Sequence, residues 1–409
     1  MANLMTLDDV QIEGKTILVR VDFNSPIDEG TKKILDETRI RTHGEATIQE
    51  LVDRDAKTVI LAHQGRPGSP DFIPLREHAE ILGRVLGQPV NFVDDIFGEK
   101  AQRAIKKLEP GEVLVLDNVR GFSKERTEGT PEKHAQTEMV QNLVPLADLF
   151  VNDAFAAAHR GHVSIIGFTA VLPSVAGRVV ERELKSLSRV LENPEKPCVF
   201  MLGGAKADDA LEISKYVLDN NIADYVLTGG VAGHVFLVAK DFNLGKPNMK
   251  YLKEKNLLDF VSGIKNLIEK YPESIKVPID VAVERNGARK EISVDDLPTQ
   301  YSILDIGSKT VDHYTSIIQK ARSIVVSGPV GVYENKEFLF GTKKLFGKVA
   351  DSTAFSLAGG GHTVAALKEF GLSDEISYIS TAGGALMEFL MGKKLPAIAA
   401  LEKAAARET

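Results

Sequence analysis

Short apolar, β-branched runs recur along the chain, and each is followed by glycine or polar residues and then by a helical pattern. Near-continuous apolar strands that alternate with helices are typical of parallel sheets covered on both faces. The pattern therefore predicts an α/β protein with two doubly wound parallel-sheet halves. The expected strands of the first half are residues 16–22, 57–63, 112–117 and 148–153. Those of the second half are residues 197–203, 224–229, 301–307, 323–328 and 376–381.

The length of the chain favours placing the two halves in separate domains. A chain of 409 residues exceeds what one hydrophobic core usually holds. The charged stretch 176–188 (AGRVVERELKSLS) predicts a helix between the last strand of one half and the first strand of the other. We therefore expect two Rossmann-like domains, residues 1–178 and 179–390, joined by this helix and facing a central cleft. A further helix is predicted at 395–407, within a C-terminal segment 391–409.

Composition excludes several kinds of partner. Lys and Arg number 50 and Asp and Glu number 57, and the formal charge of −7 gives no general attraction to nucleic acid or anionic membranes. The single cysteine, Cys198, excludes an internal disulfide and a cysteine-rich zinc site. The first residues include acids and no long apolar run, so they are not expected to be a signal peptide. No stretch of about 20 apolar residues is present that could span a bilayer. We expect a cytoplasmic protein that binds small molecules, with its oligomeric state (monomer or homodimer) left open.

Charged side chains follow the expected strands of the first half. Ligands of open α/β sheets bind beyond the carboxyl ends of the strands, where this half carries Asp22, Asn24, His63, Arg66, Arg120, His159 and Arg160. Arg39 opens the first crossover helix. A single arginine is usually solvated or salt-bridged, but four arginines and two histidines at one crevice of an acidic protein indicate an anionic ligand. Asp153 is expected to order its loop rather than to contact the ligand.

Glycine clusters follow nearly every expected strand of the second half. They are GGAK (203–206), TGG (228–230), DIG (305–307), SGPVG (327–331), AGGGHT (358–363) and STAGG (380–384). One glycine serves any tight turn, but glycine also lets backbone N–H groups approach a ligand, and a helix N-terminus favours phosphate. Six clusters in one half predict a nucleotide site with Lys206 beside it. One half is thus expected to bind a small anion and the other a nucleotide. This combination favours a phosphoryl-transfer enzyme that works by closing its two domains.

Other common motifs are incomplete. Residues 14–16 (GKT) look like the end of a P-loop, but Asp9 stands where its first glycine must be, and the tripeptide precedes a strand. The segment 359–364 ends in Val364, so no complete GxGxxG follows a strand, and no HExxH occurs. The triplet at 159–161 (HRG) lacks the aspartate of the protein-kinase catalytic loop. The other histidines that stand singly are expected to be surface or core residues: His43, His78, His134, His234 and His313.

Eight longer motifs run in order over almost the whole chain. They are RVDFNSP (20–26), AHQGRP (62–67), LDNVR (116–120), VNDAFAAAHR (151–160), LGGAK (202–206), GPVGVYE (328–334), LAGGGHT (357–363) and STAGGALMEFL (380–390). Together they resemble the phosphoglycerate kinase family, and the departures from its pattern at Ala210, Ser327 and His362 resemble its archaeal branch. The resemblance implies a two-domain hinge enzyme of glycolysis and gluconeogenesis that transfers a phosphoryl group reversibly between 1,3-bisphosphoglycerate and ADP, giving 3-phosphoglycerate and ATP. It also implies an N-terminal substrate domain, a second domain that binds the nucleotide, and a C-terminal segment that packs back on the first.

The resemblance, carried over residue by residue, implies a role for each position. Asp22 and Asn24 would hold the hydroxyl and carboxyl end of the glycerate. Its phosphate and carboxylate charge would be held by His63, Arg66, Arg120 and Arg160. Arg39 and Lys206 would be the catalytic residues, placed on the phosphoryl group in flight, and Glu334 would accept the ribose hydroxyls. The rest of the implied nucleotide site is Gly203, Gly204, Ala205, Gly229, Gly230, Pro329, Gly359, Gly360, Gly361, His362 and Thr363.

Three positions depart from the family pattern. Ala210 stands where a second phosphate-binding lysine is common, and Ser327 replaces an asparagine. His362 stands where an aspartate normally contacts the magnesium of the nucleotide, and histidine is a poor ligand for an ion that prefers oxygen. We therefore assign no protein ligand to a metal and expect Mg²⁺ to be bound mainly through ATP or ADP.

Two rival functions belong to other classes. A nicotinamide-dependent dehydrogenase could use the same sheets, but its glycine fingerprint is incomplete here. A nucleotide-sensing or scaffolding relative without turnover would need only the second half, so the first-half arginines argue against it. Tight binding of ATP without binding of 3-phosphoglycerate would favour the sensor.

Overall fold

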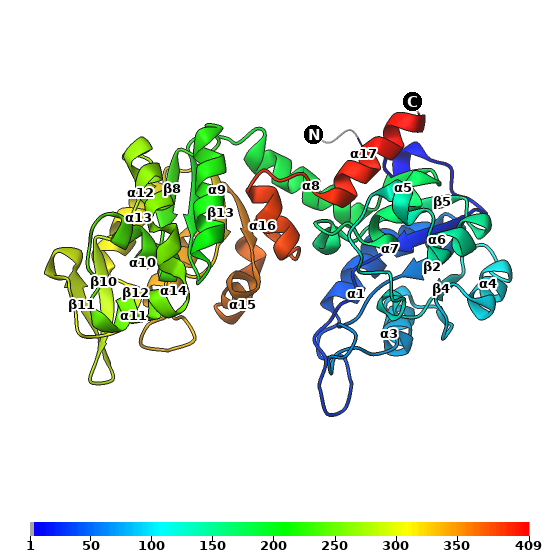
Figure 1. The fold of residues 1–409 in the computed structure, drawn as a ribbon, viewed down its shortest axis with the longest axis horizontal. Coiled ribbons are helices and arrows are strands. Elements are labelled where there is room, and N and C mark those ends of the chain that lie inside the picture. Colours follow the sequence, from blue (N-terminus) through cyan, green and yellow to red (C-terminus); the bar gives the residue numbers. More distant parts are fainter. Residues whose placement is uncertain (1–3, 409) are drawn as a thin grey trace. The chain divides into compact units, whose positions relative to one another are not determined.

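The structure, a computed structural model, describes residues 4–408 and divides into two compact units (Figure 1). Unit 1 is made of residues 4–185 and 394–408, and unit 2 is made of residues 186–393. The chain passes from unit 1 to unit 2 within α8 (Arg178–Leu191), which overlaps the helix predicted at residues 176–188. Among the described residues, no helix is both long and apolar enough to cross a membrane.

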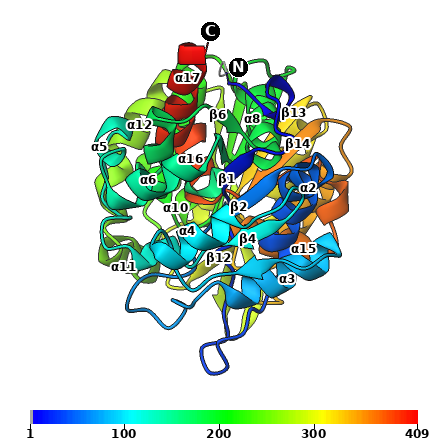
Figure 2. The same ribbon diagram turned by 90° about the vertical axis from the view of Figure 1, so that its right-hand side faces the viewer.

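Unit 1 is built on a six-stranded parallel sheet in the order β3-β4-β2-β1-β5-β6. Figure 2 shows β1, β2 and β4 side by side. β2, β4 and β3 lie on one side of β1, and β5 and β6 lie on the other. The strand order therefore reverses at β1, and a crevice for ligands is expected at the carboxyl ends of β1 and its neighbours. The strands are β1 (Thr16–Arg20), β2 (Lys57–Leu61), β3 (Asn91–Phe92), β4 (Val113–Val115), β5 (Leu149–Asn152) and β6 (Ser174–Ala176).

Helices cover both faces of this sheet. Ile17 and Val19 of β1 pack into one hydrophobic cluster with Ile40, while Leu18 packs into a second cluster with Phe168, as the alternation of side chains along a strand requires. The helices are α1 (Thr38–His43), α2 (Gln49–Asp53), α3 (Arg76–Leu86), α4 (Glu99–Lys106), α5 (Pro131–His134), α6 (Glu138–Leu143) and α7 (Val163–Ile166). Short helical turns lie at Leu7–Asp9, Gly44–Ile48, Val119–Gly121, Val144–Leu146, Phe155–Ala157 and Gly167–Ala170.

The C-terminal helix α17 (Pro396–Glu408) belongs to unit 1, where it lies beside β6 (Figure 2). The backbone N–H of Ala397 donates to the carbonyl of Ala158 (3.0 Å). The guanidinium of Arg407 donates to the carbonyl oxygens of Thr169 and Ala170. The last described residues are therefore bound to a segment more than 200 positions earlier in the chain.

Unit 2 contains a second six-stranded parallel sheet, in the order β15-β14-β13-β7-β8-β9. Its strand order reverses at β7, which pairs with β8 on one side and with β13 on the other. The strands are β7 (Cys198–Leu202), β8 (Tyr225–Thr228), β9 (Ile275–Lys276), β13 (Ser323–Ser327), β14 (Phe355–Gly359) and β15 (Tyr378–Ser380). Two parallel sheets with flanking helices confirm the predicted α/β class with two doubly wound halves.

One strand that the apolar pattern assigned to the parallel scheme lies in a different sheet. β12 (Ile303–Ile306) pairs antiparallel with β10 (Asp280–Arg285), which also forms a hairpin with β11 (Ala288–Ser293). The prediction of a parallel strand at 301–307 is therefore wrong in its pairing. The physical reason is that β10 and β11 form a separate three-stranded sheet whose outer strand β11 is half exposed and lacks a continuous apolar run.

Helices also cover the main sheet of unit 2. Val199 and Met201 of β7 pack into one hydrophobic cluster with Tyr314 and Leu345. The helices are α9 (Ala207–Asp219), α10 (Gly230–Ala239), α11 (Lys246–Glu254), α12 (Val261–Lys270), α13 (Ser308–Ile318), α14 (Phe340–Ala350), α15 (Gly361–Glu369) and α16 (Gly384–Leu390). Short helical turns lie at Leu257–Phe260, Val294–Asp296 and Ser373–Glu375.

Candidate active site

In unit 1, the loops that follow β1, β2 and β4 are tied together around Gly65. The N–H of Gly65 donates to Oδ1 of Asn24 (2.8 Å), and the guanidinium of Arg120 donates to the carbonyl of Gly65. The N–H of Asn24 in turn donates to Oδ1 of Asp22 (3.1 Å). Gly65 has a φ of 63°, and a Cβ there would lie 2.4 Å from the backbone of Asp71, so this junction requires glycine. The contacts hold three predicted site residues at the carboxyl edge of the sheet.

Positive charges gather around His63, which is 4% exposed. Burial lowers the pKa of His63 well below its usual value, and the charges of Arg20, Arg120, Arg160 and Arg39 lower it further. The structure therefore brings three of the predicted arginines together around one buried imidazole. The fourth, Arg66, is exposed. Burial lowers the pKa of Arg160, and the charge of Arg66 lowers it further. A cluster with this charge and hydrogen-bonding capacity suits a small polyanion.

Asp22 is the carboxylate inside this cluster. Its Oδ2 accepts a hydrogen bond from the guanidinium of Arg39, and its Oδ1 lies 4.0 Å from Nδ1 of His63. Asp22 is almost fully buried, whereas about a third of the Arg39 side chain is exposed. Because Arg39 is the more accessible partner, its guanidinium can turn from Asp22 to a bound ligand. His159, next to Arg160, accepts from Nε of that arginine at Nε2 (3.3 Å).

A buried chain of polar groups behind His63 was not predicted from the sequence. Arg20 is 2% exposed; its Nη2 donates to Nδ1 of His63 (3.0 Å) and its Nε donates to Oγ of Ser164 (2.8 Å). The Ser164 hydroxyl donates to Oε1 of Glu125 (2.6 Å). Since an arginine cannot accept, Nδ1 of His63 is the acceptor and the neutral imidazole carries its proton on Nε2. The sequence signal that could have indicated this buried chain is Arg20, a charged residue within the apolar run 16–22.

The carboxylate of Asp153 binds groups of the protein itself. It is fully buried, its Oδ1 accepts from the N–H of Val179 (2.8 Å) at the start of α8, and its Oδ2 lies 2.7 Å from Nδ1 of His43. A carboxylate at a helix N-terminus binds N–H groups that would otherwise lack partners. The expectation that Asp153 orders its loop agrees with these contacts, and His43 is a core residue as expected.

In unit 2, a cavity of about 580 Å³ lies at the carboxyl ends of the strands next to the reversal at β7. Its walls come from the residues that follow β7, β8, β13, β14 and β15, together with residues of α9, α10, α11 and β12. The predicted nucleotide residues that line it are Gly203, Gly204, Ala205, Lys206, Gly230, Pro329, Glu334, Gly360, Gly361, His362 and Thr363.

The glycine clusters of unit 2 let three loops bind one another backbone to backbone. The N–H of Gly204 donates to the carbonyl of Pro329 (2.7 Å), and the N–H of Gly230 donates to the carbonyl of Val330 (2.8 Å). A Cβ on Gly203 would lie 2.3 Å from the carbonyl oxygen of Pro329. A Cβ on Gly229 would meet Val330, and one on Gly359 would meet Leu386, so both glycines allow close packing. Neither is among the residues that line the cavity.

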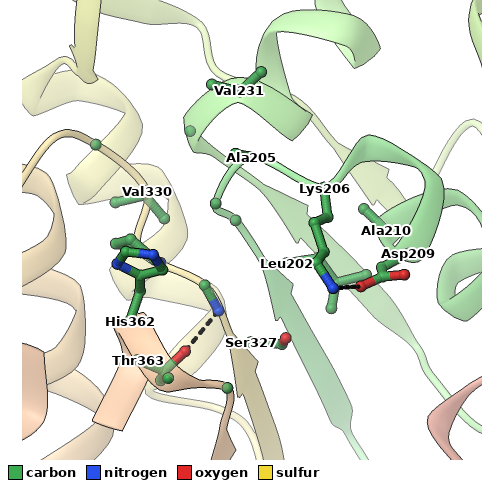
Figure 3. A pocket seen from close by; sticks show the side chains of 18 of the residues that line it. Leu202, Ala205, Lys206, Asp209, Ala210, Val231, Ser327, Val330, His362 and Thr363 are labelled. Atoms are coloured by element: carbon green, nitrogen blue, oxygen red, sulfur yellow. Dashed lines mark hydrogen bonds and ion pairs between the residues drawn. The ribbon is translucent and has the colours of Figure 1, made fainter. Parts of the chain in front are cut away.

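Lys206 and the N-terminus of α15 supply the positive potential of this cavity. Lys206 is 72% exposed and its Nζ lies 3.2 Å from Oδ2 of Asp209, as Figure 3 shows. Gly360 precedes the first turn of α15, and Oγ1 of Thr363 accepts from the N–H of Gly328 (2.7 Å), which holds this turn against the loop that follows β13. Helix N-termini and a nearby lysine favour phosphate.

The departures from the family pattern also lie in the cavity. Ala210 lines the cavity wall beside Asp209 without contributing charge, and Ser327 lies at the end of β13 (Figure 3). His362 is exposed, with Nδ1 3.5 Å from Oε1 of Glu334.

His234 corrects an expectation from the sequence. It was expected to be a surface or core residue, but it lines the cavity from α10. Burial lowers its pKa to about 4, so its imidazole is neutral near pH 7. Gly230, Val231 and His234 lie on one face of α10, and this spacing was the signal in the sequence.

The acidic residues of the cavity decide how a metal ion could bind there. Among residues 4–408, no group of three or more His, Cys, Asp or Glu side chains could hold one. Asp209 and Glu334 are the carboxylates that line the cavity. Because Mg²⁺ keeps several waters and binds substrate phosphates, these residues fit an ion carried on a nucleotide better than an ion in a protein cage.

Buried histidines predict that acid destabilises the folded chain. Burial lowers the pKa of His78 to about 4 and that of His162 to about 3, and it lowers those of His63 and His234 as well. Below about pH 6.5 the unfolded chain therefore takes up four protons that the folded chain excludes. Burial raises the pKa of Glu125 and Asp305 to about 7, so these two carboxyls act in the opposite direction. The effect of the four histidines exceeds that of the two carboxyls, so the free energy of unfolding falls below pH 6.5.

The expected result is a lower urea midpoint at pH 5 than at pH 6.5, measured by circular dichroism. The net change in the free energy of unfolding should be of the order of 2 kcal/mol, since each proton contributes up to about 1.4 kcal/mol per pH unit. Glu125→Gln removes one opposing carboxyl and should steepen the loss. An equal or higher midpoint at pH 5 would contradict the prediction.

The fold and the two sites define the class of the protein: an α/β phosphotransferase with an anion-binding cluster in one unit and a glycine-lined cavity in the other. The family model for phosphoglycerate kinase matches residues 7–393. The chain belongs to the phosphoglycerate kinase family.

Relatives and solved structures agree over the whole length. The chain is 48% identical to a phosphoglycerate kinase of Methanococcus maripaludis, over 98% of both proteins, and 45% identical to that of Methanothermus fervidus, over 100% of this chain and 99% of the relative. The crystal structure of phosphoglycerate kinase from Pyrococcus horikoshii matches with a TM-score of 0.89 at 39% identity, covering 99% of this chain and 100% of that one. The structure of the Coxiella burnetii enzyme matches with a TM-score of 0.85 at 33% identity, over 98% and 100%.

Proposed function

We propose that this chain works as a phosphoglycerate kinase, transferring a phosphoryl group reversibly between 1,3-bisphosphoglycerate and ADP to give 3-phosphoglycerate and ATP. The observation that carries the proposal is the gathering of Arg39, Arg120 and Arg160 around His63 and Asp22. A protein that only binds nucleotides has no need of this cluster, whereas an enzyme that holds a doubly phosphorylated glycerate needs several fixed cations.

Within unit 1, we assign the acidic and amide side chains and the cations to different groups of the glycerate. Asp22 and Asn24 would bind the hydroxyl and carboxyl end. His63, with its proton on Nε2, would donate to an oxygen of the substrate, and Arg66, Arg120 and Arg160 would neutralise phosphate and carboxylate. The support for this assignment is that these side chains share one edge of the sheet, at the ends of neighbouring strands.

Within unit 2, we assign the cavity to ADP or ATP. The N-terminus of α15 and Lys206 would face the phosphates, because both carry positive potential there. Glu334 would accept the ribose hydroxyls, and the interlocked loops at Gly203, Gly230 and Pro329 would form the floor of the site.

The chemistry needs positioning more than acid–base catalysis. A terminal oxygen of ADP attacks the phosphorus of the acyl phosphate, the bond from that phosphorus to the carboxyl oxygen breaks, and the electron pair stays on the carboxylate of 3-phosphoglycerate. That carboxylate is a stable leaving group, so no proton has to be moved in the step. Arg39 and Lys206 would lower the barrier by neutralising charge on the phosphoryl group in flight.

Magnesium would enter on the nucleotide. When bound, the ion would neutralise phosphate charge, and Asp209, beside Lys206, is the cavity carboxylate that could contact it directly or through water. A chelator should therefore abolish turnover without unfolding the protein.

We also propose that the two units close on each other by a hinge near residues 181–188 of α8. The support is that the chain passes between the units at only two points, after residues 185 and 393. Small-angle scattering should show compaction when ATP and 3-phosphoglycerate are both present. Curves that do not change with both substrates would count against the hinge.

A cytoplasmic location is part of the proposal. The single cysteine, Cys198, is buried and unpaired, which suits a reducing compartment.

The decisive test is the rate of ATP consumption with 3-phosphoglycerate and Mg²⁺, measured for the wild type and for Lys206→Ala. Turnover that collapses in the variant would support both the reaction and the site. Absence of turnover, with ATP still bound, would mean that Ala210 and His362 mark a loss of catalysis. Binding of ATP without any binding of 3-phosphoglycerate would favour the nucleotide sensor.

A further inference from the structure

One imidazole in the cavity of unit 2 has no assigned role. His234 lies just over one turn into α10, on the same face as Gly230 and Val231, and all three line the cavity. Gly230 is fixed by its hydrogen bond to the carbonyl of Val330 (2.8 Å), and the N–H of Ala232 donates to the carbonyl of Gly204 (3.0 Å). The first turn of α10 is therefore held firmly against the cavity, and the direction of His234 is set with it.

Part of the lining of this cavity is uncharged. Besides Val231, it contains Tyr251 of α11, Ile303 and Leu304 of β12, and Val332. Tyr251 and Val332 are each 41% exposed and are among the few large hydrophobic side chains open to solvent in the part of the chain that the structure describes. An apolar lining of this kind suits an aromatic ring.

The charged wall is formed by other elements. Lys206 and Asp209 come from the start of α9, and the N-terminus of α15 presents its N–H groups to the same cavity. Figure 3 shows Lys206 and Thr363 on elements other than α10, which carries Val231. A nucleotide offers one end to each kind of wall, phosphates to the charged one and an uncharged base to the apolar one. The base would then lie against α10, α11 and β12.

The ring of His234 has hydrogen-bonding capacity that the protein does not use. No hydrogen bond or ion pair joins its nitrogens to another described residue, and the side chain lies half-buried in the lining of the cavity. A neutral imidazole presents one N–H donor and one nitrogen acceptor. A half-buried polar group without a protein partner is costly unless water or a ligand binds it.

We propose that His234 hydrogen bonds the edge of the nucleobase and is a specificity-determining residue for the nucleotide. The inference rests on the proposed function, because it takes the cavity as the ADP and ATP site. His234 contributes nothing to the phosphates, so its effect is confined to ligands that carry a base.

The test compares ATP with inosine triphosphate and with inorganic tripolyphosphate, which has no base. His234→Phe keeps an aromatic ring but removes both hydrogen-bonding nitrogens. We expect the KM for ATP to rise about threefold to tenfold, as the loss of one hydrogen bond implies. The Ki of tripolyphosphate, measured as a competitor of ATP, should stay unchanged, as should kcat and the KM for 3-phosphoglycerate. The ratio of kcat/KM for ATP to that for inosine triphosphate should shift at least about threefold, because the two bases differ in their edge groups.

Two further variants guard against a purely structural effect. His234→Asn retains a donor and an acceptor and should keep the KM for ATP closer to the wild-type value than His234→Phe does. His313→Phe is the matched control, because His313 is a half-buried histidine on α13 that does not line the cavity. It should leave every constant unchanged.

The outcomes separate the inference from the proposed function. No consumption of ATP by the wild type would overturn the function. An active wild type whose His234→Phe variant keeps the same base ratio, or raises the Ki of tripolyphosphate as much as the KM for ATP, would overturn the inference alone.

Discussion

Lys206→Ala is expected to lower kcat at least about a hundredfold while changing the KM for ATP much less. In the structure Lys206 is 72% exposed, and its ion pair to Asp209, at 3.2 Å, is of the weak surface kind. The lysine is therefore free to move to the phosphoryl group when both substrates are present. A cation directed at a transition state contributes about 3 kcal/mol or more, which is the hundredfold. Steady-state kinetics in both directions measures the effect.

A matched control is available in the same unit. Lys265 is an exposed lysine whose Nζ lies 2.8 Å from Oδ1 of Asp241, and it does not line the cavity. Lys265→Ala should leave kcat and both KM values unchanged. A Lys206→Ala variant with unchanged kcat and a raised KM for ATP would show that the lysine only binds the nucleotide.

Arg39→Ala is expected to have an effect of the same size through the other substrate. The guanidinium of Arg39 pairs with buried Asp22, at the edge of the cluster around His63. In the role proposed for Arg39, its removal takes a cation away from the transition state, and it leaves the carboxylate of Asp22 without this partner. We expect kcat to fall at least about a hundredfold. Added guanidinium ion should restore part of the lost rate, because the space of the side chain then lies open beside Asp22.

The neighbouring arginine provides the comparison. Arg41 lies on the same helix and pairs at 3.0 Å with Glu45 on an exposed surface. Arg41→Ala should retain wild-type kcat and should not respond to guanidinium. If Arg39→Ala loses affinity for 3-phosphoglycerate while kcat is unchanged, Arg39 binds the substrate without acting on the phosphoryl group.

The parallel sheets could be predicted from the sequence because their strands are buried on both faces and are therefore largely apolar. In a run such as residues 16–20, the three central positions are all apolar, and a helix comes later in the chain. The hairpin of β10 and β11 was missed because its outer strand alternates in burial and carries charge. The signal that could have found it is the Asn286-Gly287 pair, whose φ values of 54° and 76° are those of a tight hairpin turn.

The positions of the strand ends predicted which residues of the candidate site lie close together. They did not predict the contacts that hold those residues in place. His63 and Asp22 follow neighbouring strands, so their proximity could be expected from topology. Glu125 and Ser164 are 39 positions apart and meet only because the loop after β4 folds against α7. His234 could not be assigned without knowing that α10 begins at Gly230. Pairwise contacts between loops depend on packing that no local pattern encodes.

The return of α17 to unit 1 has a consequence for how the chain is made. Unit 2 is continuous, from residue 186 to residue 393, whereas unit 1 is completed only by residues 394–408. On the ribosome, every residue of unit 2 is synthesised before the helix that covers β6. Unit 2 can therefore fold while unit 1 still exposes the apolar surface that α17 will bury. A truncated chain that ends at residue 393 should show a protease-resistant unit 2 and a protease-sensitive unit 1.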